Sequence, residues 1–178
     1  MTSTEAGPLA LALLGAAVVA SAWGWTRAGR QIWPPIALAL LVAAMAVAAP
    51  AYVHDDTASA VGVTLAVVLA VLGGGPVTAW VFAFIDRHDA PGQPSMRDAG
   101  TVLRGGAWIG ALERTAIAAS LLAGWPSGVA LALALKGLGR YPELRSQDNP
   151  GTAERFIIGT FTSVLWAAAC AGVVLLLA

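Results

Sequence analysis

The sequence predicts an all-α integral membrane protein, a single transmembrane domain of about six helices over residues 1–178. Hydrophobic residues make up 58% of the chain and charged residues only 11%, whereas soluble domains average about 45 to 50% and about 25%. The apolar residues gather into runs long enough to cross ~30 Å of hydrocarbon. Nine of the ten Lys and Arg residues fall in segments that would lie on one side of such a bundle.

The first two apolar runs follow each other closely in the first part of the chain, residues 1–85. Residues 8–25 form the first run, and no Lys or Arg precedes it. A signal peptide begins with such charges, so we interpret this run as a retained helix. The second run, 33–51, begins at Trp33-Pro34-Pro35, and proline is tolerated in the first turn of a helix.

The third run, residues 58–85, is longer than the roughly 20 residues that a span needs. Gly73, Gly74, Gly75 and Pro76 interrupt it, which predicts a kink or a break in this helix. Two interpretations stay open for the interruption. It either bends the helix for packing, or it unwinds the helix and exposes backbone groups to an ion, as in transporters with broken helices.

A mixed loop, 86–104, separates these runs from the last three, which lie in residues 105–178. The fourth run, 106–124, contains two adjacent charges. The fifth, 126–141, has a short apolar part and spans only if its basic residues extend toward the headgroups. The sixth run, 153–178, ends the sequence.

The distribution of basic residues predicts the orientation of these runs. With the N-terminus outside, nine basic residues face the cytoplasm and none faces out, a strong positive-inside bias. They are Arg27, Arg30, Arg87, Arg97, Arg104, Lys136, Arg140, Arg145 and Arg155. Six spans then place both termini outside the bacterial cytoplasmic membrane. A re-entrant third or fifth run would change this parity.

Several classes of site are excluded by composition and motifs. The net charge of zero argues against nucleic acid as a partner. Cys170 is the single cysteine, so no internal disulfide forms and a thiolate or metal site is not expected. His54 and His88 fall on opposite faces of the predicted bundle and cannot share a metal. The sequence has no Walker loop, HExxH or GxSxG motif, so we predict no cofactor and no catalytic residue.

Glu113 and Arg114 stand in the middle of the fourth run, where charges are costly. A central charge costs roughly 2.5 to 3.5 kcal/mol, while each Leu or Ile returns only about 0.3 to 0.6 kcal/mol. Neighbouring helices must therefore shelter the pair. Mostly small or polar residues recur with Glu113 at helical spacing, which favours close packing on another helix and points Glu113 into the bundle. These residues are Gly106, Gly110, Ile117, Ser120 and Gly124.

The last two runs supply partners for this pair. Lys136 is the nearest cation on the adjoining run, because it lies four residues, or ~6 Å of helix, from Arg140. On the sixth run, Thr160 lies beside Ser163, and Glu154 stands at the cytoplasmic entrance. Together they predict a polar, cytoplasm-facing pocket among the last three helices. Its predicted residues are Glu113, Arg114, Lys136, Arg140, Glu143, Glu154, Thr160 and Ser163.

The order and spacing of these polar residues resemble the C-terminal part of a bacterial family of membrane proteins known only as a domain of unknown function. The resemblance covers about the last 75 residues. It is carried by Leu112-Glu113-Arg114, Lys136-x-x-x-Arg140-Tyr141-x-Glu143, Ala153-Glu154 and Ile158-Gly159-Thr160-x-x-Ser163. Gly137 and Tyr141 depart from the Ser and Phe of the family pattern. The resemblance implies that these helices form one unit, and it transfers no activity.

The sequence leaves more than one function open. The leading interpretation is a non-enzymatic membrane protein, embedded in the lipid bilayer, whose pocket holds an ion, a small solute or a lipid headgroup. Intramembrane ionisable groups usually mark such sites. Alternatively, the charges only fix helix packing in a structural subunit that binds a membrane protein partner. A transporter, or a lipid-modifying enzyme with Glu113 or Glu154 as acid/base, is a further alternative.

Overall fold

The computed structural model describes residues 3–49, 56–88, 106–145 and 151–178. These residues form seven helices, and no strand occurs among them, which confirms the predicted all-α class. The helices are α1 (Ser3–Trp23), α2 (Trp33–Ala48), α3 (Asp56–His88), α5 (Gly106–Leu122), α6 (Ser127–Gly139), α7 (Tyr141–Arg145) and α8 (Thr152–Leu177).

Each predicted apolar run coincides with one of the six longer helices, and only the short α7 is additional. Three of them, α1, α3 and α8, are long and apolar enough to cross a membrane. The apolar helices α2 and α6 are shorter, at 16 and 13 residues. Helix α5 has 17 residues and carries the two adjacent charges.

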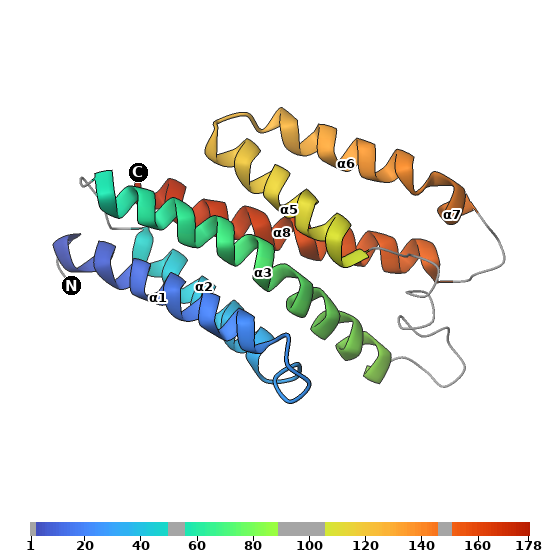
Figure 1. Cartoon of the computed structure of the whole chain (residues 1–178), viewed down its shortest axis with the longest axis horizontal. Helices are drawn as coiled ribbons and strands as arrows, with labels where there is room; N and C mark the ends of the chain where they lie inside the picture. Colours follow the sequence, from blue (N-terminus) through green and yellow to red (C-terminus); the bar gives the residue numbers. More distant parts are fainter. Residues whose placement is uncertain (1–2, 50–55, 89–105, 146–150) are drawn as a thin grey trace.

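The helices run back and forth along one long axis (Figure 1). Helices α3 and α8 pack together in the middle, the α1–α2 pair packs on one side, and α5 packs against both central helices on the other. Helix α6 lies along α5 at the edge of the bundle. The N- and C-termini lie at one end, which we call the terminal end. The α1–α2 connection, the end of α3 and the start of α8 lie toward the other, which we call the basic end.

The segment Gly73–Pro76 does not break α3, which continues as one helix of 33 residues. The interpretation in which this segment unwinds the helix is therefore wrong. Pro76 has no backbone N–H, so the carbonyl of Leu72 loses its normal helical donor. The side chain of Trp25 replaces that donor, because its Nε1–H lies 2.9 Å from the Leu72 oxygen. The helix continues because a tertiary hydrogen bond satisfies the group that proline leaves open.

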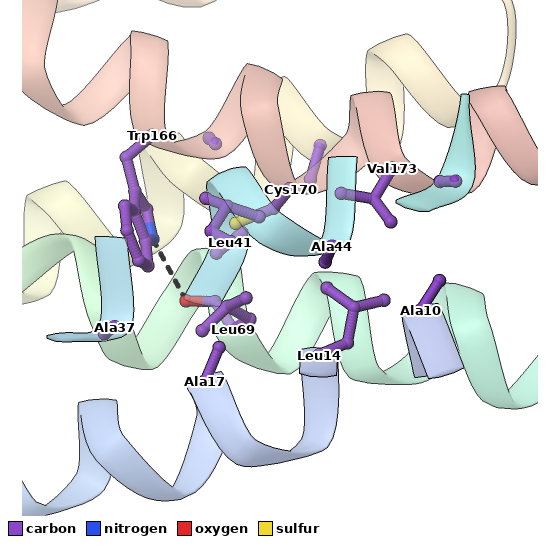
Figure 2. Close-up of a cluster of buried hydrophobic side chains, with 14 of the residues drawn as sticks. Ala10, Leu14, Ala17, Ala37, Leu41, Ala44, Leu69, Trp166, Cys170 and Val173 are labelled. Carbon is purple, nitrogen blue, oxygen red and sulfur yellow. Dashed lines mark hydrogen bonds between the residues drawn. The ribbon is translucent and has the colours of Figure 1, made fainter. Parts of the chain in front are cut away.

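The core fills the terminal end of the bundle, where α1, α2, α3 and α8 meet (Figure 2). Alanine recurs along α1 and α2 in this core, and small residues let membrane helices approach closely. Trp166 of α8 lies against Gly73 of α3, and its indole N–H donates a 3.1 Å hydrogen bond to the carbonyl of Leu69. This end is therefore tightly packed, and the charged side chains of α5, α6 and α8 lie elsewhere.

Candidate functional site

A cavity of about 500 Å³ opens among α3, α5 and α8. Residues of the α1–α2 connection and of the C-terminal end of α6 complete its wall. Its polar lining consists of Arg30, Thr78, Arg114, Lys136, Arg140, Arg155, Thr160 and Ser163, and its larger apolar residues are Trp25, Pro76, Phe82, Ile109 and Phe156. Five basic side chains thus line the cavity. No Asp or Glu of the described residues does so.

Arg114 is the most deeply buried of these cations, with only 4% of its surface exposed. Its Nη2 donates a 2.9 Å hydrogen bond to the carbonyl oxygen of Val71 on α3. Its Nη1 donates to the hydroxyl of Ser163 on α8 at 3.3 Å. Arg114 therefore joins the three helices that surround the cavity. Its Nε is buried without a hydrogen-bond partner.

Two glycines make room for the Arg114 side chain. A Cβ atom added to Gly74 of α3 would overlap Cδ and Nε of Arg114. A Cβ added to Gly110, one turn earlier on α5, would lie 2.9 Å from Nη1. Any larger residue at Gly74 would displace the guanidinium. Gly74 of α3 thus admits a charged side chain between helices.

The described lining of the cavity reaches Arg114 on α5 and Ser163 on α8 and extends no further along these helices. Arg114 lies eight residues into α5, or about 12 Å, and Ser163 lies eleven residues into α8, or about 16 Å along the helix. Just beyond them Ile117, Ala118 and Trp166 are buried in the core. Arg114 therefore lies at the closed inner end of this cavity, which we call the funnel.

Glu113 and Lys136 form an ion pair between α5 and α6, with 2.5 Å between Oε2 and Nζ. Only 12% and 15% of these two side chains is exposed, so the pair is largely shielded from solvent. Helix spacing predicted this partner for Glu113. Lys136 also lies 5.5 Å from the centre of the Phe156 ring on α8, and it therefore links α6 to the funnel wall.

The predicted inward face of α5 is confirmed in part. Gly110, Ile117 and Ser120 are buried as expected, whereas Gly106 and Gly124 are exposed, and Arg114, which was not placed on that face, is buried too. Adjacent residues on a helix point about 100° apart, so Glu113 turns toward α6 when Arg114 enters the gap at Gly74. The side chain of Glu113 is only 12% exposed and pairs with Lys136 between α5 and α6, which agrees with its predicted direction into the bundle. The sequence of α5 alone carries no sign of the space that α3 provides.

The other predicted residues divide between the funnel and its surroundings. Arg140 lines the funnel and pairs with Glu143 of α7, at 3.3 Å between Nη1 and Oε1. Thr160 and Ser163 also line it. Glu154 is exposed and does not line it. The funnel-lining residues of α8 recur every three or four positions from Arg155, and Glu154 falls outside that face.

Several lining residues were missed, because α3 and the α1–α2 connection also line the cavity that lies among the last three helices. Arg155 of α8 holds its guanidinium carbon 3.9 Å from the ring centre of Phe82 on α3, a cation–π contact. The spacing of Arg155 four residues before Gly159 could have placed it on the funnel face. Trp25 and Arg30 carry no such signal, because they reach the funnel through tertiary packing.

The lining donates hydrogen bonds more than it accepts them, since guanidinium and ammonium groups have no acceptor atom. Among the described residues, no group of three His, Cys, Asp or Glu side chains could hold a metal ion. The chemistry of the funnel therefore matches an acceptor-rich, negatively charged group.

No protein family, curated protein or solved structure matches this chain. The resemblance of the last 75 residues to a bacterial membrane protein family stays a prediction.

Proposed function

We propose that this chain is an integral protein of the bacterial cytoplasmic membrane and that its funnel binds an anionic group from the cytoplasm. The observation that carries the proposal is the charge of the lining, which has five cations and, among the residues that the structure describes, no carboxylate. Ionisable groups within a membrane are rare and usually mark ligand sites or pathways. Glycine on two helices makes room for Arg114 at the closed end, which supports a role for this residue beyond packing.

The membrane part of this proposal has six spans with both termini outside. Three long apolar helices and the alternating directions of the six longer helices in Figure 1 support it. Helix α6 is short, about 20 Å, and it spans if Lys136 and Arg140 extend to the headgroups. In this orientation the basic end faces the cytoplasm, as the positive-inside rule requires.

The blind end favours binding over permanent conduction. A pore past Arg114 would need a polar route to the terminal end, and Ile117, Ala118 and Trp166 fill that space. The proposed protein therefore holds its anion, with access from the basic end.

A structural subunit is the second candidate. Leu131, Leu135 and Leu138 are more than half exposed on α6, and they recur at three- and four-residue spacing on one face. Helix α6 packs mainly along α5, so this face is open to lipid or to a membrane protein partner.

Thermal unfolding of the purified protein in detergent tests anion binding. The salts to compare at constant ionic strength are sodium phosphate, sulfate and acetate. At least one of them should raise Tm as its concentration increases, because a ligand that binds the folded state stabilises it. Arg155→Gln should abolish that rise. Arg27→Gln is the matched control, because Arg27 is exposed and does not line the funnel. An equal rise in Tm in the unmodified protein and in both variants would reject the funnel as the binding site.

A further inference from the structure

We infer that the bound group is a phosphate monoester carried on an apolar body. This inference rests on the proposed function, because it names the class of anion that the funnel takes. It follows from three properties of the funnel, namely its excess of positive charge, its buried polar atoms without hydrogen-bond partners, and its size.

The excess charge matches a dianion. Three carboxylates of the described residues interact with cations that line the funnel. Glu113 pairs with Lys136, Glu143 pairs with Arg140, and Asp86 acts on Arg155. Even with all three counted, the five lining cations exceed them by two. A phosphate monoester carries about −1.5 to −2 at pH 7, whereas a carboxylate carries a single charge.

The buried polar atoms without hydrogen-bond partners match a ligand group that has several acceptor oxygens. Arg114 Nε, Arg155 Nη1 and Thr160 Oγ1 are buried without a hydrogen-bond partner, and all three residues line the funnel. Buried polar groups normally have partners, so such atoms call for an explanation, and a bound ion is one. Guanidinium groups suit phosphate because their planar forks donate two hydrogen bonds at once.

The size and the apolar wall match an organic ligand better than a bare ion. Sites for small organic molecules usually enclose about 300 to 1,000 Å³, and the funnel's 500 Å³ falls within this range. Trp25, Phe82 and Phe156 line it from three different segments. Inorganic phosphate would leave these rings without a ligand contact, whereas an acyl, prenyl or aromatic group would cover them.

The phosphate could come from a lipid headgroup or from a soluble phosphate ester. Basic pockets between membrane helices on the cytoplasmic side bind phosphate-bearing headgroups, and a soluble ester presents the same dianion. The shared chemistry is the phosphate monoester on an apolar body. The two sources differ in the length of that body.

Calorimetric titration of the full-length protein in detergent separates these sources. The probes are dihexanoyl phosphatidic acid, phenyl phosphate, benzoate and inorganic phosphate. We expect one of the two phosphate esters to bind at least tenfold more tightly than benzoate and inorganic phosphate. Tighter binding of the phosphatidic acid identifies a lipid source, and tighter binding of phenyl phosphate identifies a soluble one. Binding of the ester should weaken about tenfold from pH 7.5 to pH 5, because its second ionisation lies near pH 6.

Variants locate the binding. Arg155→Gln and Arg30→Gln should each weaken ester binding at least tenfold, and Arg27→Gln should leave it unchanged. Arg30 is exposed, so its variant should fold even if Arg155→Gln does not. Benzoate binding as tight as either ester, and lost in the same variants, would overturn the phosphate assignment and leave the proposed function standing. Absence of binding by every probe would overturn both.

Discussion

The indole nitrogen of Trp25 donates a 2.9 Å hydrogen bond to the carbonyl oxygen of Leu72, the oxygen that Pro76 leaves without its helical donor. The ring of Trp25 also lies over Gly75, where an added Cβ would stand 2.9 Å from it. The α1–α2 connection is therefore fastened to α3 beside the funnel. Because Trp25 and Arg30 belong to the same connection, this contact helps to fix the position of a lining cation.

Replacing Trp25 by Phe should lower the free energy of unfolding by about 1 kcal/mol, the usual net value of one hydrogen bond. In a Pro76→Ala background the loss should be smaller, since alanine restores an N–H that can donate to Leu72. Chemical unfolding in mixed micelles measures both. Trp23→Phe is the matched control, because Trp23 is 55% exposed and Trp25 is 53% exposed. Equal losses with and without Pro76 would contradict the explanation.

Gly74→Ala should destabilise the protein by about 1 to 3 kcal/mol, the typical effect of overpacking a well-filled site. The new methyl group would collide with Arg114 and separate its Nη2 from Val71. Gly15→Ala is the control, because nothing lies within 4 Å of a Cβ added there. That variant should be neutral or gain about 0.5 to 1 kcal/mol, as alanine does in a helix. If both variants melted at the same temperature, the proposed fit of Arg114 against Gly74 would be wrong.

Neutralising one member of the Glu113–Lys136 pair should destabilise more than expected from additive effects, because it leaves the other charge buried alone. A double-mutant cycle of Glu113→Gln and Lys136→Met should give a coupling above about 0.6 kcal/mol, the average for polar contacts between membrane helices. Unfolding in mixed micelles supplies the four free energies. Strictly additive effects would mean that the 2.5 Å contact contributes no net stability.

The six-span topology predicts which connections a membrane-impermeant thiol reagent can reach in intact cells. Ala123→Cys in the α5–α6 connection should react, and Ala28→Cys in the α1–α2 connection should react only after lysis, because positive charge keeps that side in the cytoplasm. Both positions are exposed. The native Cys170 is buried, so the unmodified chain serves as the blank. Labelling of Ala28→Cys in intact cells would reject the orientation.

The helices and one contact of the site could be predicted from the sequence. Apolar runs separated by polar or Gly/Pro segments are a strong one-dimensional signal, and all six coincide with helices. The pairing of Glu113 with Lys136 was also accessible, because a tight turn at Trp125-Pro126 makes α5 and α6 antiparallel neighbours and places these residues at similar depth.

The shape of the funnel could not be predicted in this way. Arg114 is buried because Gly74 on another helix leaves space for it. The residue periodicity of one helix gives no information about the space that a neighbouring helix leaves. The contribution of Arg30 depends on how the α1–α2 connection folds over α3. The unbroken path of α3 depends on Trp25, 47 residues from its acceptor. Each of these facts arises from contacts between distant segments.

The α5–α6 hairpin has a consequence for biosynthesis. In the proposed topology, segments made one after the other, joined by a short turn and carrying opposite charges at matching depth, can enter the bilayer with Glu113 already paired to Lys136. Neither Glu113 nor Lys136 then has to meet hydrocarbon alone, at roughly 2.5 to 3.5 kcal/mol each. Arg114 finds the carbonyl of Val71 on the earlier helix α3, and Ser163 becomes available later, with α8. Helix α8, which follows α5 in the chain, therefore supplies a second hydrogen-bond partner to the buried guanidinium.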